Sequence, residues 1–204
     1  RHYHIIRDIP RVDYYYYPIE DVLGDLYGES ISSDADLIMC GNSAAEANNH
    51  EFLLRHLHRL GVSGKKIVFP LSYCGSPEYI HRVKECGSIL YGENFIPITD
   101  FLPLNDYNKL FLNAAVCIYA SWRQMAVGNI LVALYLGSKV YLSKKNPWLK
   151  DARKLGFVVF VLEEATRQSF AEPLSEFGRL NNRCIVEHLF SSERLLNLIQ
   201  AQFA

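Results

Sequence analysis

The chain has 204 residues, of which 50% are hydrophobic and 21% charged, a balance typical of a globular protein with a substantial apolar core. Its formal net charge is −1, and because nucleic-acid-binding proteins usually carry a basic excess, we expect no nucleic-acid partner. The five cysteines show no CxxC spacing, which argues against a zinc site or a disulfide framework and fits a reducing compartment, the cytoplasm.

The chain divides into three segments by its residue patterns. Residues 1–33 show no clean helical or strand period, and we expect them to be an interdomain or connecting segment. Residues 34–190 alternate regularly between short apolar runs and segments with helical periodicity, and are expected to form one domain. Residues 191–204 have the period of a C-terminal helix, with Ser191 or Ser192 as its cap.

Short runs of apolar and β-branched residues predict the strands, in an order that favours a parallel sheet buried on both faces. A less regular run at 89–95 predicts a further strand. The five clear runs are 36–40, 66–71, 116–120, 139–142 and 157–162.

Segments with helical periodicity lie between these strands. Gly61, Gly87 and Gly137 are expected to end three of the helices, and Asn105 and Asn146 to cap two others. The alternation of strand and helix predicts a doubly wound α/β fold, a Rossmann-like parallel sheet flanked by helices. The predicted helices cover 49–61, 76–87, 105–115, 128–137, 146–156 and 172–181.

The loop after the first strand is the first candidate for a binding site, because ligands of open α/β sheets lie outside the carboxyl ends of the strands. Gly41 allows a sharp turn. Amide and hydroxyl groups that suit sugar hydroxyls and phosphate oxygens then follow. In the alternative interpretation, Asn48 or Asn49 only caps the next helix and His50 is solvent-exposed. These side chains belong to Asn42, Ser43, Asn48, Asn49 and His50.

The loop after the strand at 116–120 is the second candidate. Arg123 and Gln124 lie in a polar turn, and Gly128 with Asn129 opens a helix whose free N–H groups could hold a diphosphate. Alternatively, this is an ordinary helix start with a surface charge.

Tyr73 and Asn146 follow two other strands. Tyr73 could stack on a base or sugar, although a tyrosine at a strand end is more often a packing residue. Asn146 could contact the ligand, but the capping role is favoured. No residue stands out as nucleophile or general base, so the catalytic residue is unknown, and no metal site is predicted.

Four sequence motifs resemble a known family when they are taken in order. The stretches "GNSAAEANNH", "VFPLSY" with "EYI", "RQMAVGN" and "LGSKVYLSKKNPW" are similar to the TDP-N-acetylfucosamine:lipid II N-acetylfucosaminyltransferases of glycosyltransferase family 56. The resemblance covers roughly residues 36–162. It implies a GT-B enzyme, in which two Rossmann-like domains face each other across the active site. Since the motifs fall in one such unit and the chain begins with Arg1, we expect it to be the C-terminal, donor-binding half.

The resemblance also implies the reaction and its partners. The donor would be a nucleotide-diphosphate sugar such as TDP-N-acetylfucosamine, and the enzyme a hexosyltransferase without metal or other cofactor. The acceptor would be a lipid-linked saccharide held by the N-terminal domain, in synthesis of a cell-surface polysaccharide such as enterobacterial common antigen. Such an enzyme would work in the cytoplasm, in peripheral contact with the inner membrane. In one departure from many GT-B enzymes, the helix "GNILVALYLG" has no acidic residue to hold a ribose.

Two other classes remain open from the residues alone. A nucleotide-sugar epimerase would need an acid and a base that the chain does not display. A non-catalytic, flavodoxin-like nucleotide-binding or regulatory module would need no catalytic residue, but its response-regulator form would place acidic residues where Asn42 and Ser43 stand.

Overall fold

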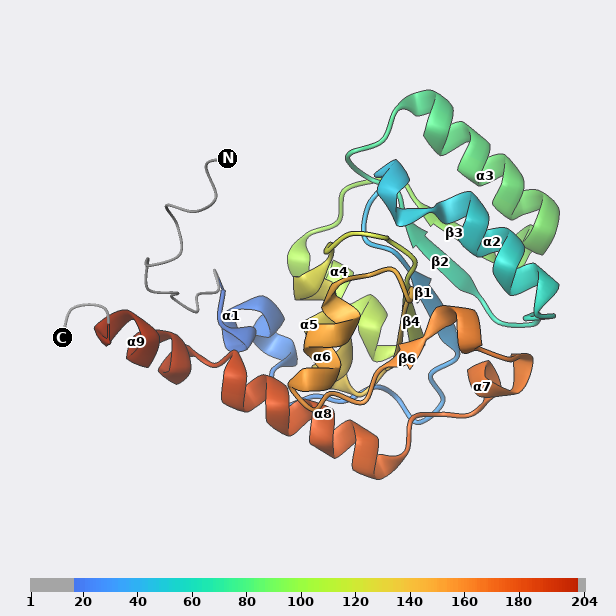
Figure 1. The fold of residues 1–204 in the computed structure, drawn as a ribbon. Helices are drawn as coiled ribbons and strands as arrows, with labels where there is room; N and C mark the ends of the chain where they lie inside the picture. Colours follow the sequence, from blue (N-terminus) through green and yellow to red (C-terminus); the bar gives the residue numbers. More distant parts are fainter. Residues whose placement is uncertain (1–16, 202–204) are drawn as a thin grey trace, which may run out of the picture.

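The structure, a computed structural model, describes residues 17–201. Six parallel strands form one sheet in the order β3-β2-β1-β4-β5-β6 (Figure 1). The chain runs outward from β1 to β3, returns to place β4 beside β1, and then continues to the other edge. The sheet therefore reverses its winding between β1 and β4, as predicted for a doubly wound fold. The strands are β1 Leu37–Cys40, β2 Ile67–Pro70, β3 Phe95–Ile98, β4 Ala114–Tyr119, β5 Lys139–Leu142 and β6 Phe160–Val161.

Helices cover both faces of the sheet (Figure 1). Helices α2 (His50–Arg59) and α3 (Pro77–Tyr91) bury leucine, valine and tyrosine side chains against one face. The other face packs against α4 (Leu104–Leu112), α5 (Val127–Leu136) and α6 (Trp148–Lys154). The sheet thus has a hydrophobic core on each side, which explains why its strands read as continuous apolar runs.

The strand predicted over 89–95 is wrong in position. Helix α3 continues through Gly87 to Tyr91, and β3 begins only at Phe95. A Cβ atom on Gly87 would lie 2.5 Å from the Phe95 ring, so the glycine permits close packing of helix on strand and does not end the helix. The strand predicted over 157–162 is also shorter, because only Phe160 and Val161 pair with β5.

The prediction that Asn105 caps a helix is wrong as well. Helix α4 begins at Leu104 after Pro103, and the Asn105 Nδ2 group donates to Asp25 Oδ2 at 3.2 Å. Proline is tolerated at the start of a helix because its missing N–H would have no partner there.

Helix α1 and helix α8, from opposite ends of the described chain, both pack against α5. Helix α1 (Ile19–Leu23) is held there by a hydrogen bond from Ile19 N to Phe190 O, 2.8 Å long. Ser191 caps α9 by accepting from Arg194 N. Helix α9 has no buried residue and extends away from the sheet (Figure 1). The remaining helices are α7 (Arg167–Ala171), α8 (Glu176–Leu189) and α9 (Ser192–Gln200).

The division of the chain into segments 1–33, 34–190 and 191–204 stays a prediction. Residues 1–16 and 202–204 lie outside the described part of the chain. All five cysteines lie in the described part of the chain and are free thiols. Among residues 17–201, no helix has the length and apolar character needed to cross a membrane.

Candidate functional site

The candidate site lies at the carboxyl ends of β1 and β4, where the loops that follow these neighbouring strands diverge. The loop after β1 leads to α2 on one face of the sheet, and the loop after β4 leads to α5 on the other. Asn49, at the amino end of α2, donates from Nδ2 to Ala120 O at 2.8 Å. This bond ties the two loops together across the point at which the sheet reverses its winding, the usual place for a ligand in this architecture.

Gly41 provides the sharp turn that the sequence predicted. Its φ is +72°, a conformation that favours glycine, and a Cβ atom would lie 3.3 Å from Asn48 and 3.4 Å from His50 Nε2. Asn48 is buried and donates to Ser43 O at 2.9 Å and to Ser43 Oγ at 3.3 Å. Asn48 and Ser43 therefore hold the shape of the loop from inside.

His50 lies beneath this loop and is completely buried, with 0% of its surface exposed. Its Nδ1 atom is 2.9 Å from the Tyr79 hydroxyl, and its ring packs against Phe69. Burial lowers the pKa of His50 to about 4, so the imidazole is neutral at physiological pH. The alternative in which His50 is solvent-exposed is wrong, and its position here is that of a support for the Gly41 turn.

A pocket of about 220 Å³ opens at this edge of the sheet. Asn42 from the β1 loop and Asn129 from the first turn of α5 both line it. Asn42 donates to the Tyr73 hydroxyl at 3.2 Å, and Asn129 donates to the Tyr107 hydroxyl at 2.6 Å. Asn42 Oδ1 is buried without a hydrogen-bond partner among the described residues, which leaves an acceptor for a bound molecule. The wall is otherwise mostly apolar and includes Pro70, Ile98, Phe101, Leu102 and Leu104.

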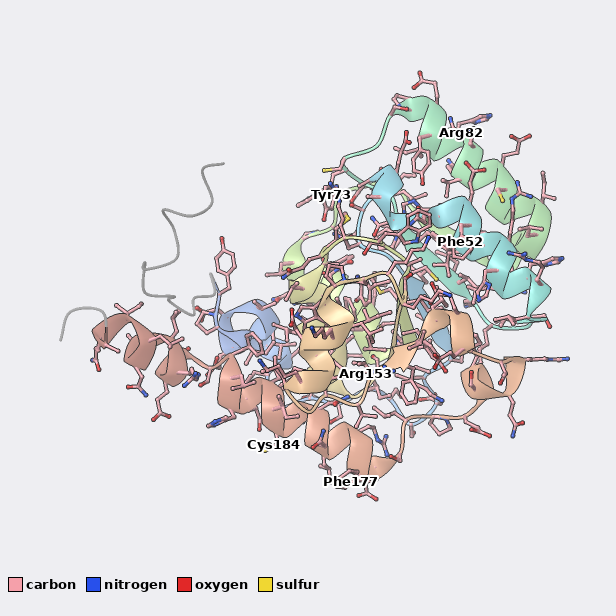
Figure 2. The ribbon with its side chains drawn as sticks, viewed as in Figure 1. Phe52, Tyr73, Arg82, Arg153, Phe177 and Cys184 are labelled. Atoms are coloured by element: carbon pink, nitrogen blue, oxygen red, sulfur yellow. The ribbon has the colours of Figure 1, made fainter. Side chains whose placement is uncertain are left out.

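Tyr73 is 46% exposed at the rim of this pocket. Its backbone carbonyl accepts from Ala44 N at 2.9 Å, so the β2 loop is joined to the β1 loop by main chain as well as by the Asn42 side chain. Figure 2 shows Tyr73 at this end of the molecule, far from Phe177 on α8. The structure therefore brings Asn42 and Tyr73 from two loops together with Asn129 from the first turn of α5.

The loop after β3 completes the pocket, and the sequence analysis missed it. Asp100, Phe101 and Leu102 line the pocket from this loop. It was overlooked because the strand was expected several residues too early. The usable signal was the run "FIPITDFLP", in which four apolar residues are followed by Thr99 and Asp100 and then by the proline before α4.

The amino end of α5 presents exposed polar groups beside the pocket. Arg123 and Gln124 are exposed in the preceding turn, where Ala126 adopts a left-handed conformation with φ of 58°. Gly128 lies in the first turn, and a Cβ atom there would meet nothing within 4 Å. The first N–H groups of a helix have no partner inside it, so this end of α5 can accept an anionic group.

Asn146 lies just before Pro147, which has the N-cap position of α6, and its side chain bonds the first N–H of that helix, close to the capping role that the sequence favoured. It is buried, its Oδ1 accepts from Trp148 N at 3.0 Å, and its Nδ2 donates to Ser121 Oγ at 3.1 Å. It thus starts α6 and fixes the β5 loop to the β4 loop, and it does not line the pocket. Within residues 17–201, no three His, Cys, Asp or Glu side chains gather as candidate ligands for a metal ion.

Comparison with solved structures defines the class of fold. The chain resembles AviGT4, a glycosyltransferase involved in avilamycin A biosynthesis, with a TM-score of 0.64 and 14% identity over 97% of this chain and 57% of that one. Sucrose-phosphate synthase from Thermosynechococcus elongatus gives a TM-score of 0.66 and 15% identity over 92% and 49%. A glycosyltransferase from Rickettsia africae ESF-5 gives 0.64 and 14% over 90% and 51%. The fold is that of one Rossmann-like half of a GT-B glycosyltransferase, and the chain spans about half the length of these proteins.

The family is more specific. Residues 11–191 match the family described as 4-alpha-L-fucosyltransferase, glycosyl transferase group 56. The chain therefore belongs to glycosyltransferase family 56.

Proposed function

We propose that this chain is the donor-binding half of a family 56 hexosyltransferase that takes a nucleotide-diphosphate sugar. The observation that carries the proposal is the pocket in which Asn42 and Asn129 meet from opposite sides of the sheet reversal. Pockets that enclose a whole drug-sized ligand measure about 300–1,000 Å³, and this one measures about 220 Å³. It would hold one end of the donor, which we assign to the base, with Tyr73 stacked on it.

The diphosphate would then lie over the amino end of α5. When the bond between the anomeric carbon and the diphosphate breaks, negative charge grows on the phosphate oxygens. The N–H groups around Gly128, with the exposed Arg123 side chain, would stabilise that charge. Preorganised donors of this kind contribute to the rate because they need no rearrangement as the charge develops.

Membership of family 56 supports a proposal for the particular donor and acceptor. We propose a TDP-N-acetylfucosamine-like donor and a lipid-linked saccharide acceptor bound by a second domain, in the assembly of a cell-surface polysaccharide. The apolar wall of the pocket favours a base with an apolar substituent, such as the methyl group of thymine. A lipid-linked acceptor would place the enzyme in peripheral contact with the cytoplasmic face of the inner membrane.

Calorimetric titration with TDP, UDP, GDP and a TDP-sugar, without and then with magnesium, tests the donor assignment. We expect metal-independent binding, tightest for TDP. Tyr73→Ala should weaken TDP binding, because stacking of a base on an aromatic ring is worth about 1–3 kcal/mol. Phe177→Ala is the matched control: Phe177 is equally aromatic, is 77% exposed and lies on α8 away from the pocket (Figure 2).

The outcomes separate the parts of the proposal. If Tyr73→Ala binds TDP as tightly as the wild type, the assignment of the base to this pocket is wrong. If neither the folded chain nor the complete protein binds any nucleotide, the donor assignment is wrong. Nucleotide binding by the complete protein, with no sugar transfer to any lipid-linked acceptor, would favour the non-catalytic module instead.

A further inference from the structure

Basic side chains gather around α6. Residues 144–154 contain five basic and one acidic side chain, although the chain as a whole has a net charge of −1. Lys144, Lys145, Lys150 and Arg153 line an open cavity of about 420 Å³. All four are exposed, and none has an acidic partner within ion-pair distance among residues 17–201.

The acidic groups near these cations form no ion pair with them among residues 17–201, although the Lys144 ammonium has a favourable electrostatic interaction with the Glu163 carboxylate. Glu163 accepts hydrogen bonds from the backbone N–H of Lys144 at 2.8 Å and from Ser143 Oγ at 2.7 Å. Its carboxylate is therefore used by the main chain and by a buried hydroxyl. Asp151, the acidic residue of the 144–154 segment, makes no ion pair with a described residue.

A large aromatic side chain borders the same cluster. Trp122, in the turn after β4, is 53% exposed, and Lys145 Nζ lies 3.6 Å from the centre of its ring. An indole has an apolar body and a polar N–H edge, a combination that is enriched where one side of a surface is apolar and the other is wet. We call Trp122, Lys144, Lys145, Lys150 and Arg153 the basic face.

The basic face is extended. Lys144 and Lys145 lie in the loop after β5, whereas Arg153 lies near the other end of α6, far from Tyr73 (Figure 2). A helix of this length spans about 10 Å. Cations spread over such a distance, with an indole at one end, suit an extended negative surface better than a single phosphate group.

We propose that the basic face docks on an anionic lipid bilayer, with Trp122 at the level of the headgroups and the four cations above the lipid phosphates. Each Lys or Arg near an anionic membrane strengthens binding by roughly fivefold. Docking in this orientation would bring the β4 loop, which also carries Arg123 and Gln124, close to the bilayer. That consequence for a lipid-linked acceptor rests on the proposed function, whereas the docking itself does not.

Vesicle binding of the 204-residue chain, measured without nucleotide, tests the proposal. The chain should co-sediment with vesicles of phosphatidylcholine and phosphatidylglycerol and not with phosphatidylcholine alone. The triple variant Lys144→Gln, Lys145→Gln, Lys150→Gln should lose about 100-fold in partition. The matched control removes three lysines elsewhere, Lys65→Gln, Lys66→Gln, Lys84→Gln, and should retain most of the binding.

Tryptophan fluorescence reports the orientation. Trp148 is buried at 6% exposure, so a blue shift and quenching by brominated lipids should come from Trp122 and disappear in Trp122→Phe. Absence of vesicle binding, or equal losses in the two triple variants, would overturn the proposal. Binding of inorganic pyrophosphate that the Lys144 triple variant abolishes, without vesicle binding, would show a discrete anion site in its place. Because no nucleotide is present, the vesicle results are independent of donor binding, and the pyrophosphate result is separated from the α5 site by its dependence on Lys144, Lys145 and Lys150.

Discussion

Gly75 offers a direct test of how the pocket is held together. A Cβ atom at this position would lie 2.5 Å from the Ala44 Cβ and 2.7 Å from the Ala44 carbonyl oxygen. Gly75 does not have a positive φ, so a Gly75→Ala substitution meets no backbone penalty and its cost comes from contact alone. Carbon atoms prefer separations of about 3.5–4.0 Å, so the β1 and β2 loops must move apart by roughly 1 Å.

Such overpacking typically costs about 1–3 kcal/mol. Ala44 is fully buried and donates to Tyr73 O at 2.9 Å, so it cannot move without disturbing that bond. Urea unfolding should show a lower midpoint at an unchanged slope. TDP titration should show weaker binding, because Tyr73 moves with its loop.

Gly128→Ala is the control for stability. A Cβ atom there meets nothing within 4 Å, and alanine is favoured over glycine in a helix by up to about 1 kcal/mol. This variant should unfold at the same urea concentration or higher, while the added methyl group should weaken diphosphate binding at the α5 end. If Gly75→Ala unfolds like the wild type and binds TDP equally well, the close contact of the two loops is not what shapes the pocket.

Three further predictions concern the framework of the site. Asn49→Gly keeps the left-handed backbone (φ 55°) but loses the bond to Ala120 O, and it should lower the free energy of unfolding by about 1 kcal/mol. In the same urea titration, Asn49→Ala should cost about 1–2 kcal/mol more, because alanine is strained in that backbone conformation. Equal losses in the two variants would contradict the backbone argument. Because burial lowers the pKa of His50 from 6.5 to about 4, the unfolded chain takes up this proton first as the pH falls. Neutral, buried His50 therefore contributes about 3 kcal/mol to the free energy of unfolding above pH 6.5, and this contribution is lost between about pH 6.5 and 4. In urea titrations at several pH values, His50→Gln should lack this loss of stability between pH 6.5 and 4. A variant whose stability changes with pH as the wild type's does would show that His50 is not its source. Gly87→Ala should lower the thermal midpoint through contact with the Phe95 ring, and an unchanged midpoint would show that the ring can move aside.

Much of the fold was predictable because its signals are local. Apolar runs of four to six residues separated by amphipathic helices indicate parallel strands with connecting helices, and the six-stranded sheet confirms this. The turn at Gly41 was predictable for the same reason, because the residue lies at the boundary between an apolar strand and a polar loop. Parallel strands bring their carboxyl ends to one edge of the sheet, so the loops that carry Asn42 and Asn129 could both be named as candidates for the site from the sequence.

Contacts between distant segments decided the rest. The extent of α3 depends on Gly87 packing against Phe95, and no periodicity within the helix reports that contact. The loop at Asp100 joins the pocket only because β3 pairs with β2 at the edge of the sheet. Neighbouring polar residues of the motif "GNSAAEANNH" also have different positions: Asn42 lines the pocket, whereas His50 lies under the loop beside Tyr79. The sequence by itself indicated the loops after β1 and β4, because local patterns mark where a strand ends and a helix begins. Only the tertiary structure decided the order of the strands, the entry of the β3 loop into the pocket and the side chains that face a ligand, because these depend on contacts between distant segments.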